Sequence, residues 1–398
     1  MDILIHPRTL RGDIDIIPSK SQAHRLLICS AFADQPTQLR CPEISRDMVA
    51  TMDCLSSLGA QIIRTESGFS VFPASSIPAA VTLNCCESGS TLRFMLPIAG
   101  ALGVDATFLM EGRLPQRPLS PLWEEMERMG CRLTRPTENT IRCQGKLLPG
   151  QYQIDGSVSS QFVTGLLLAL SLLDSESSLS ITGKTESRPY IDLTRQTLRR
   201  FGTDPDHPGK YRLHSPGYLT VEGDWSNGAF FLAADYLDAD PVLTVHGLCD
   251  NSVQGDRAAA HLIPALCRQH CVIDASDIPD LVPILSVIAA AKHGAVFTGI
   301  HRLRIKESDR VASTAAMIRN LSGKAESTED TLTVYGTGLS GGVVDACNDH
   351  RIAMSAAIAS TVCKKDVVIL GAECVQKSYP RFWEEFSRLG GKYEQYIR

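Results

Sequence analysis

Residues 55–62 read LSSLGAQI, a helix-like segment that ends at a glycine and leads into a short apolar strand. A glycine just past a helix end supplies a left-handed cap, and the apolar residues after it are typical of a strand. The pattern returns at residues 126–133, 198–203, 266–273, 318–323 and 386–393, although His270 and Cys271 replace the glycine in the fourth copy. Repeats of roughly 50 to 70 residues are too long for a solenoid and predict one small α/β subdomain each.

The six copies divide naturally into two domains of three. A chain of 398 residues exceeds one ordinary core, and domains of roughly 100 to 250 residues each are expected. Between the third and fourth copies, strand-like residues 218–221 give way to helix-like residues 229–236. We therefore expect the chain to cross between domains near residues 221–228.

Composition excludes several classes of function. The net charge of −5 and the low aromatic content of 6% argue against a nucleic-acid surface, which needs a basic patch interleaved with stacking rings. Residues 165–173 and 281–291 are the longest apolar stretches singled out, and they are shorter than the ~18 residues of a membrane span. Both are interpreted as buried helices. An anionic ligand would therefore need a local concentration of cations.

The cysteines and the first residues indicate a cytoplasmic protein. Thirteen cysteines are scattered along a long chain, as expected for reduced thiols that pack as small core residues. The start, Met1 to Leu4, lacks the basic region and small-residue cleavage site of a secretory signal. Cys267, His270 and Cys271 form a metal-like cluster but have no second pair at zinc spacing, so no metal is expected.

The charge run KESDR at residues 306–310 is the strongest sign of function. On a helix, Lys306 and Arg310 would stand four apart and repel each other, unless an anion lay between them. Opposite charges three apart, Lys306 with Asp309 and Glu307 with Arg310, would instead make the run a self-compensating solvated patch. Other parts of the chain have to decide between these interpretations.

Residues 18–25, PSKSQAHR, lead directly into an apolar run and predict a helix start. Ser19 is a typical N-cap, which places Lys20 in the first helical turn. A cation there opposes the helix dipole, but it fits a phosphate that docks on the free N–H groups with Lys20, Ser21 and Arg25 around it. A simple capped helix explains the segment equally well, and the glycine-rich lead-in of a P-loop is missing.

Three further segments repeat this theme, at residues 87–93, 157–162 and 348–351. Each places hydroxyl groups, a glycine or a cation at the expected start of an apolar helix, and each also fits ordinary capping. Arg117 and Lys377 are cations in strand or loop contexts. Asp280 and Glu307 are the acid and base candidates, and Asp280 could also be an N-cap of the apolar helix that follows it.

In this order, these segments resemble the 5-enolpyruvylshikimate-3-phosphate synthases, and the resemblance runs from about Pro18 to Phe382. The most specific matches are residues 18–25, 158–162, 187–192, 221–224, 254–256, 306–310 and 348–351. The resemblance implies an α/β (α+β) fold of two globular domains, each of three βαβαββ units around parallel buried helices, an inside-out α/β barrel. It implies domains of residues 1–18 plus 224–398 and of residues 19–223.

The resemblance also implies a reaction. The enolpyruvyl group of phosphoenolpyruvate moves to the 5-hydroxyl of shikimate 3-phosphate, phosphate is released, and no metal or organic cofactor is needed. This step belongs to chorismate and aromatic amino acid biosynthesis. Helix N-termini would point into an interdomain cleft, where their dipoles attract two polyanions, and domain closure would assemble the site. A monomer is the family expectation, with no nucleic-acid or membrane partner.

Residue roles carried over from the resemblance are as follows. Asp280 would accept the proton of the 5-hydroxyl, Glu307 would relay the proton of the methylene carbon, and Lys20 is the third catalytic candidate. Lys306 would bind the hydroxyls and tune Glu307. The implied ligands of shikimate 3-phosphate are Lys20, Ser21, Arg25, Ser159, Ser160, Gln161, Ser187, Tyr190, Asp280 and Lys306. The implied ligands of phosphoenolpyruvate are Lys20, Gly89, Arg117, Gln161, Arg310, Arg351 and Lys377.

The chain departs from the family pattern at Glu87, where asparagine is usual, and in the short segment at residues 203–217. A carboxylate ~4 Å from a substrate anion would cost about 4 kcal/mol at an effective dielectric of 20. Glu87 is therefore expected to turn away, to pair with a cation such as Arg93, or to be protonated.

Two other functions fit parts of the sequence. The related transferase that acts on UDP-N-acetylglucosamine shares the fold, but it has asparagine where this chain has Ser21 and a cysteine in the loop that corresponds to residues 112–117. A non-catalytic phosphometabolite-binding protein is the second alternative, and the presence of both Asp280 and Glu307 argues against it.

Overall fold

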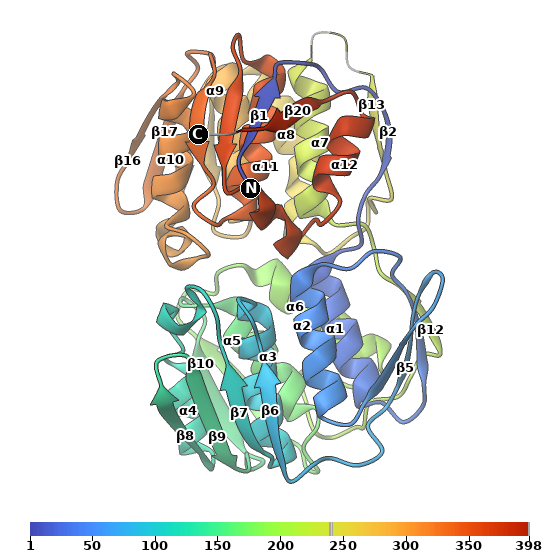
Figure 1. Cartoon of the computed structure of the whole chain (residues 1–398). Coiled ribbons are helices and arrows are strands. Elements are labelled where there is room, and N and C mark those ends of the chain that lie inside the picture. The colour runs from blue at the N-terminus through green and yellow to red at the C-terminus, as the bar shows by residue number, and fades with distance from the viewer. Residues whose placement is uncertain (239, 241, 397–398) are drawn as a thin grey trace. The chain divides into compact units, whose positions relative to one another are not determined.

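The computed structural model describes residues 1–238, 240 and 242–396. The chain forms two compact units, which are described separately below (Figure 1). Unit 1 comprises Met1–Ile17 and Gly223–Arg398, and unit 2 comprises Pro18–Glu222. Each boundary lies one residue from the position that the resemblance implied. Among the described residues, no helix combines the length and hydropathy that crossing a membrane requires.

Unit 2 contains six α-helices and three sheets. The helices are α1 (Lys20–Ala31), α2 (Arg46–Ser57), α3 (Gly89–Leu102), α4 (Leu122–Arg128), α5 (Ser160–Leu170) and α6 (Arg188–Arg200). The strands are β3 (Thr37–Arg40), β4 (Gln61–Arg64), β5 (Gly68–Phe72), β6 (Ala80–Asn84), β7 (Asp105–Leu109), β8 (Cys131–Thr137), β9 (Thr140–Gly145), β10 (Gln151–Asp155), β11 (Ser178–Thr182) and β12 (Tyr218–Thr220). The sheet orders are β12-β3-β5-β4, β6-β7-β9-β8 and β10-β11.

Unit 1 repeats this plan. Its helices are α7 (Trp225–Leu237), α8 (Ala259–Arg268), α9 (Val282–Ala291), α10 (Arg310–Asn320), α11 (His350–Ala359) and α12 (Phe382–Arg388). Its strands are β1 (Ile3–His6), β2 (Gly12–Asp15), β13 (Leu243–His246), β14 (Cys271–Asp274), β15 (Ala295–Thr298), β16 (Lys324–Ser327), β17 (Thr331–Tyr335), β18 (Gly342–Asp345), β19 (Val367–Leu370) and β20 (Lys392–Gln395). The sheet orders are β18-β19-β1-β20, β14-β15-β17-β16 and β13-β2.

The βαβαββ plan is clearest in the subdomain that contains α3. Strands β6 and β7 are parallel, and β9 is antiparallel to both β7 and β8. The subdomain of α9 has the same order and directions. In two other subdomains, a strand that is distant in sequence completes the sheet: β12 pairs with β3, and β1 inserts between β19 and β20.

The remaining subdomain of each unit has a sheet of two strands instead of four, β10-β11 in unit 2 and β13-β2 in unit 1. In unit 2 the chain passes from α6 to β12 through residues 203–217, none of which lies in a strand. The pattern at residues 198–203 therefore predicted the helix end correctly but not a strand after it. In the four-stranded subdomains of α3 and α9, an antiparallel strand pair follows the second helix. Residues 203–217 occupy the corresponding part of the sequence after α6.

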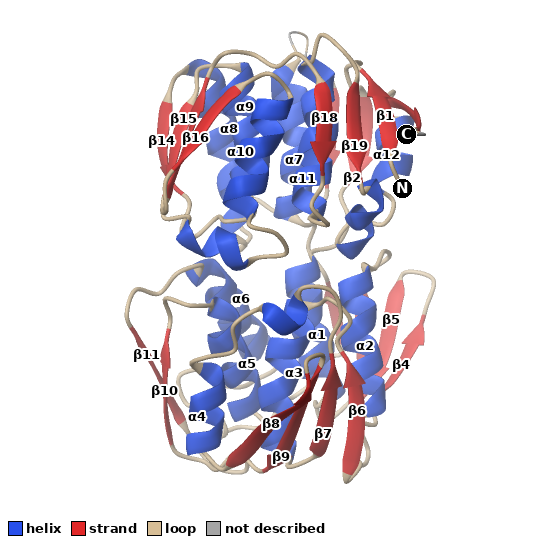
Figure 2. Cartoon of the chain, turned by 60° about the vertical axis from the view of Figure 1, so that its left-hand side comes forward, coloured by secondary structure: helices blue, strands red, loops and turns tan. Residues whose placement is uncertain are grey.

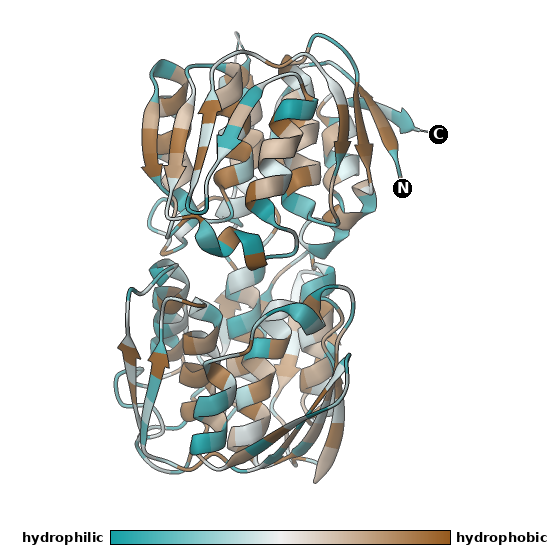
Figure 3. Ribbon diagram, turned by 90° about the vertical axis from the view of Figure 1, so that its left-hand side faces the viewer, coloured by the Kyte–Doolittle hydropathy of each residue, from teal (hydrophilic) through white to brown (hydrophobic). Residues whose placement is uncertain are grey.

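The helices alternate between two environments along the chain. Helices α1, α3 and α5 in unit 2 and α7, α9 and α11 in unit 1 are buried along most of their length. The other six helices carry the repeated helix-end pattern, with glycine in all but α8, and expose one face. Sheets flank the helices in each unit (Figure 2), and Figure 3 shows hydrophobic residues along strands and inner helices.

Two helix ends show why glycine recurs in the pattern. Gly59 after α2 and Gly130 after α4 have φ values of +101° and +109°, a region that other residues rarely adopt. After α10 the left-handed residue is Ser322 rather than Gly323. The prediction of a helix followed by a strand is confirmed in five of the six copies, because α2, α4, α8, α10 and α12 each lead into a strand.

Candidate active site

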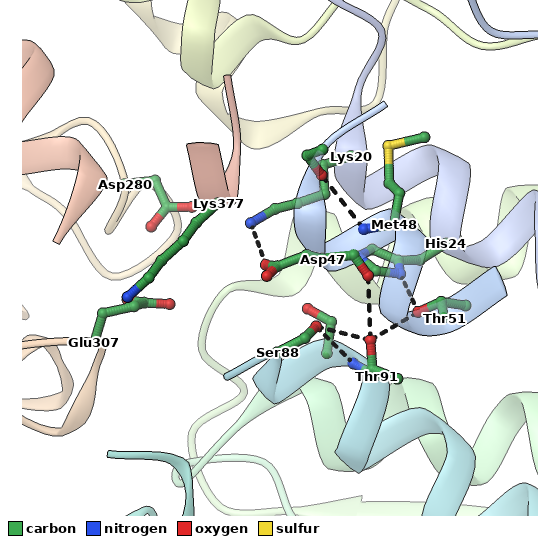
Figure 4. A network of polar contacts seen from close by, with 12 residues as sticks. Lys20, His24, Asp47, Met48, Thr51, Ser88, Thr91, Asp280, Glu307 and Lys377 are labelled. Carbon is green, nitrogen blue, oxygen red and sulfur yellow. Dashed lines mark hydrogen bonds and ion pairs between the residues drawn. The ribbon is translucent and has the colours of Figure 1, made fainter. Parts of the chain in front are cut away.

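Lys20 is the first residue of α1, where Ser19 is the N-cap as predicted, and Arg25 lies in the second turn. The Lys20 Nζ donates to Asp47 Oδ2 at 2.8 Å, from the first turn of α1 to the first turn of α2 (Figure 4). Arg25 is fully buried, and its guanidinium donates to Thr194, to Thr164 and to the carbonyl oxygens of Ser21 and Tyr190. Burial lowers the pKa of Arg25 to about 10, so it remains a cation at neutral pH.

Gly89 begins α3 at a place where a side chain would meet the guanidinium groups of two arginines. A Cβ atom built on Gly89 would lie 2.6 Å from Nη1 of both Arg93 and Arg117. The start of α3 thus brings free backbone N–H groups against two guanidinium groups, an arrangement that suits an anion. Arg93 Nη1 also donates to Gln161 Oε1 at 3.0 Å, and Gln161 Nε2 donates to Ser90 at 3.1 Å. These contacts join the starts of α3 and α5.

Glu87 precedes Gly89 by two residues, and its carboxylate lies against the loop that contains Gly112. A Cβ on Gly112, where φ is +56°, would lie 1.7 Å from Glu87 Oε1. Arg93 contributes hydrogen bonds to Gln161 and to the carbonyl of Pro118. The carboxylate is thus packed against Gly112, and the three outcomes expected for Glu87 stay predictions.

The remaining candidates of unit 2 lie at the starts of α5 and α6. Ser159 is the N-cap of α5 and accepts from the Gln161 backbone N–H, while Ser160 is the first helical residue. Ser187 precedes α6 with φ of +52°, an unusual value for serine, and Tyr190 follows in the first turn. Sparsely populated backbone conformations of this kind concentrate at functional sites. Tyr190 reaches the site through its carbonyl, which accepts from Arg25.

Arg310 is the centre of the candidate site in unit 1. Its guanidinium is 1% exposed and donates to three carboxylates: Nη1 to Asp280 at 2.7 Å, Nη2 to Glu307 at 2.6 Å, and Nε to Asp349 at 2.9 Å. Burial alone would lower the pKa of Arg310, but the three carboxylates raise it above its ordinary value. The Arg310 guanidinium is planar and always charged. It can therefore release one of its three carboxylate partners and bind a substrate carboxylate in its place.

Asp280 joins Arg310 to Arg351. Its Oδ2 accepts from Arg351 Nη2 at 3.1 Å, and the N-cap residue of α9 is Leu281 rather than Asp280. Asp280 is therefore not a simple cap, because its carboxylate is used by two arginines. Burial would raise the pKa of Asp280, but Arg351, Arg310 and Lys306 lower it well below its ordinary value. Asp280 is thus an ionised carboxylate in this structure.

The run at residues 306–310 is not a helical face. Lys306 to Asp309 precede α10, Asp309 is its N-cap, and Arg310 is its first residue, so the i,i+4 repulsion on a helix does not apply. The pair Glu307–Arg310 forms, whereas Asp309 pairs with Arg304 at 3.0 Å. Burial lowers the pKa of Lys306 to about 8, against the opposing effect of Asp280. Ser308 and Arg310 are buried, whereas Lys306, Glu307 and Asp309 are partly exposed, so the run is not a fully solvated patch.

Arg351 and Lys377 are the two remaining cationic candidates of unit 1. Arg351 lies in α11, and Lys377 lies in the 3₁₀ helix Ala372–Lys377. Arg351 is the second residue of α11 and is 4% exposed, and its Nε and Nη1 are buried without hydrogen-bond partners. Lys377 ends a short 3₁₀ helix and donates to the carbonyl of Asn348 at 2.9 Å, just before α11. Two cations therefore converge on the start of one buried helix.

Three acidic residues of these networks were not selected as site residues from the sequence. Asp349 lies within the residue 348–351 motif, but its pairing with Arg310 needs α10 and α11 to pack together. Asp256 lies in the 254–256 motif, is buried, and accepts a hydrogen bond from Ser226. Asp47 follows the N-cap Ser45, where an acidic residue is ordinary. Only its contact with Lys20 distinguishes it.

The residues that suggested a metal do not form a site in the part of the chain that the structure describes. Among these residues there is no group of three histidine, cysteine, aspartate or glutamate side chains placed to hold a metal ion. The thiols of Cys267 and Cys271 instead face the carbonyls of Tyr236 and Gln269, at 3.7 and 3.6 Å.

Comparison with known proteins gives one family for the whole chain. The family model described as EPSP synthase (3-phosphoshikimate 1-carboxyvinyltransferase) matches residues 5–270 and 267–386. The chain belongs to the EPSP synthase family. Curated relatives named 3-phosphoshikimate 1-carboxyvinyltransferase include that of Clostridium kluyveri, 37% identical over 99% of this chain and 98% of the relative. That of Clostridioides difficile is 35% identical over 98% of each chain.

Solved structures show the same fold. An EPSP synthase from Acinetobacter baumannii has a TM-score of 0.79 at 22% identity and covers 99% of this chain and 100% of that chain. The enolpyruvyl transferase NikO from Streptomyces tendae has a TM-score of 0.78 at 15% identity, covering 99% and 98%. The predicted EPSP synthase family, its two-domain enolpyruvyl transferase fold and the transferase class are thus confirmed.

Proposed function

We propose that this chain transfers the enolpyruvyl group of phosphoenolpyruvate to the 5-hydroxyl of shikimate 3-phosphate and releases phosphate. The family match over nearly the whole chain supports the reaction. The observation that carries the residue assignment is the cluster of the buried Arg310 and Arg351 with the partly buried Asp280 and Glu307, which combines fixed cations with two carboxylates. We also propose a monomer in the cytoplasm, where the thirteen cysteines, all free thiols here, would stay reduced.

Shikimate 3-phosphate is assigned to the helix starts of unit 2 and to two residues of unit 1. A phosphate group is a dianion near neutral pH, and helix N-termini with nearby cations stabilise it. The serines at the starts of α5 and α6 offer hydroxyl groups for the phosphate and the ring. The proposed ligands are Lys20, Ser21, Arg25, Ser159, Ser160, Gln161, Ser187, Tyr190, Asp280 and Lys306.

Phosphoenolpyruvate is assigned to the glycine start of α3 and to the arginines of unit 1. The space at Gly89, lined by Arg93 and Arg117, suits a phosphate, and Arg310 with Arg351 suits a carboxylate through planar paired hydrogen bonds. The proposed ligands are Lys20, Gly89, Arg117, Gln161, Arg310, Arg351 and Lys377. A substrate carboxylate on Arg310 would take a position that Glu307 holds in this structure.

The proton transfers follow from the two carboxylates. Asp280 accepts the proton of the 5-hydroxyl as its oxygen bonds to C2 of phosphoenolpyruvate, while Glu307 delivers a proton to C3. The tetrahedral intermediate then returns a proton from C3 to Glu307 as the C2–O bond to phosphate breaks. The leaving phosphate takes the proton that Asp280 holds, so both carboxyl groups end as they began. Lys20, Arg310 and Arg351 stabilise the charge that develops, because fixed cations need no reorganisation. No step requires a metal or an organic cofactor.

Phosphate release with both substrates tests the proposal. We expect release that depends on shikimate 3-phosphate, that disappears in Glu307→Gln, and that is unchanged in Glu326→Gln, an exposed control in the same unit. Replacing shikimate 3-phosphate with UDP-N-acetylglucosamine is expected to give no release. Tight binding of both substrates without release would overturn the proposal in favour of a phosphometabolite-binding protein.

A further inference from the structure

Helices α1 and α2 are joined by two side-chain contacts one helical turn apart. At their starts, Lys20 Nζ donates to Asp47 Oδ2 at 2.8 Å. One turn further in, His24 Nδ1 and Thr51 Oγ1 are 2.7 Å apart. Residues four apart on a helix share one face, so Lys20 with His24 and Asp47 with Thr51 form two matched pairs across the helix contact. The outer pair is charged and partly exposed, and the inner pair is buried.

The inner contact continues into α3, as Figure 4 shows. Thr51 Oγ1 lies 2.8 Å from Thr91 Oγ1, and Thr91 lies in the first turn of α3. The Thr91 hydroxyl also reaches the Ser88 hydroxyl at 2.8 Å and the Asp47 carbonyl at 3.4 Å. The starts of three helices are therefore connected, and α3 is the helix that begins with Gly89.

The outer pair of this network is charged, whereas the inner pair is neutral. Lys20 in a first turn opposes the dipole of α1, whereas Asp47 in the first turn of α2 is favoured by that helix dipole. Burial, and then Lys20 and Arg25, lower the pKa of His24 well below its ordinary value, so the inner contact is neutral. Asp47 is thus the charged group that holds the ammonium of Lys20 toward α2.

We propose that Asp47 is a positioning residue for Lys20, and that the Thr51–Thr91 contact keeps Asp47 in register with the start of α3. This inference rests on the proposed function, which assigns Lys20 to both substrates. A side chain with four rotatable bonds loses much freedom when it is held in one place, and the ion pair with Asp47 supplies that restriction before substrate arrives. Asp47 itself contacts no substrate in this scheme.

Asp47 could affect the substrates in two opposite ways, by repelling them or by positioning Lys20. The direction in which the Michaelis constants change when Asp47 is replaced distinguishes these two effects. A carboxylate beside two anionic substrates repels them, so its removal would lower both Michaelis constants if repulsion were its main effect. If Asp47 mainly positions Lys20, its removal raises the Michaelis constants and lowers kcat. We expect Asp47→Ala to reduce kcat/KM for phosphoenolpyruvate by about tenfold, within the range for misplaced groups. Asp47→Asn is expected to lose less, because its amide oxygen can still accept from Lys20.

Asp53→Asn is the matched control, since Asp53 is an exposed aspartate on the same helix. It is expected to leave both Michaelis constants and kcat unchanged. A fall in either Michaelis constant in Asp47→Asn, or no change in Asp47→Ala, would overturn the positioning role.

The role of the buried contact is tested with Thr51→Val, which removes the hydroxyl and keeps the shape. We expect its Michaelis constants to rise several-fold and Thr51→Ser to restore them, because serine keeps the hydroxyl. Thr197→Val is the control: Thr197 is also buried, but its hydroxyl bonds only the Leu193 carbonyl of its own helix, as described here. If Thr51→Val and Thr197→Val lower the melting temperature alike and leave the Michaelis constants unchanged, the contact is merely structural and the coupling to Lys20 is rejected.

The wild-type protein separates the two proposals. Phosphate release by the wild type, measured in the same assay, establishes the proposed function whatever the variants do. Release by the wild type together with unaffected Asp47 variants would reject the positioning role alone. Absence of release by the wild type would reject the proposed function, and with it the role of Asp47.

Discussion

Asp349 is a fully buried carboxylate that caps α11 and holds Arg310, and its replacement is expected to destabilise unit 1 strongly. The carboxylate accepts from Arg310 Nε at 2.9 Å, from Ser308 Oγ at 3.0 Å and from the backbone N–H of Arg351 at 3.0 Å. In Asp349→Ala the cap loss costs about 1 kcal/mol. Removing one partner of a buried ion pair costs about 3–5 kcal/mol.

Arg310 keeps Asp280 and Glu307 in this variant, so we expect the lower end of that range for the ion pair, which gives about 4 kcal/mol in all once the cap loss is added. For domains of 150–250 residues, each kcal/mol shifts the melting temperature by roughly 2–4 °C, which predicts a fall of about 8–16 °C. Asp349→Asn keeps a good cap and an oxygen toward Arg310, so its loss should be roughly half as large.

Differential scanning calorimetry checks these values, and phosphate release reports the effect on Arg310. The matched control is Asp309→Asn, a neighbouring N-cap that is partly exposed and pairs with Arg304. It should cost no more than about 1 kcal/mol, because exposed ion pairs contribute little and asparagine caps as well. If Asp349→Ala and Asp349→Asn both lose about 1 kcal/mol or less, the buried pair with Arg310 contributes no stability and the reasoning fails.

Three further outcomes are expected. Glu87→Asn should lower the Michaelis constant for phosphoenolpyruvate, since a negative charge near Gly89 is removed; an unchanged or raised value would show that packing against Gly112 keeps the carboxylate out of the site. Because the pKa of Lys306 is about 8, kcat/KM for shikimate 3-phosphate should fall as pH rises through 8. Lys306→Arg should move this fall to higher pH. A fall that stays at the same pH would exclude Lys306 as the group that titrates. Burial and Asp280 raise the pKa of Asp256 to about 7, so the folded state binds more protons than the unfolded state between pH 4 and 7, and stability should fall as pH rises through that range. Asp256→Asn should remove this slope in urea unfolding, and a slope that persists would place the titration elsewhere.

The sequence determined the helix starts and the repeated subdomains. Capping depends on a few neighbouring residues, so Ser19 and Ser159 could be interpreted locally, and both are N-caps in the structure. The repeated helix-end pattern predicted five helix-to-strand transitions for the same reason, four of them with a glycine. The pattern failed after α6, because whether a strand forms depends on a partner strand, which residues 203–217 do not have in this structure.

The tertiary structure decided how the charges pair. Asp280, Glu307 and Asp349 come from three segments, and only the packing of α9, α10 and α11 brings them to one guanidinium. The sequence showed the run at residues 306–310 but not that it leads into a helix and that Arg310 is buried. It gave no reason to choose Asp47, because an acid in a first helical turn is common whether or not a lysine faces it. Local hydrogen bonds are encoded within a few residues, whereas an ion pair between distant segments exists only once the core has placed their helices side by side.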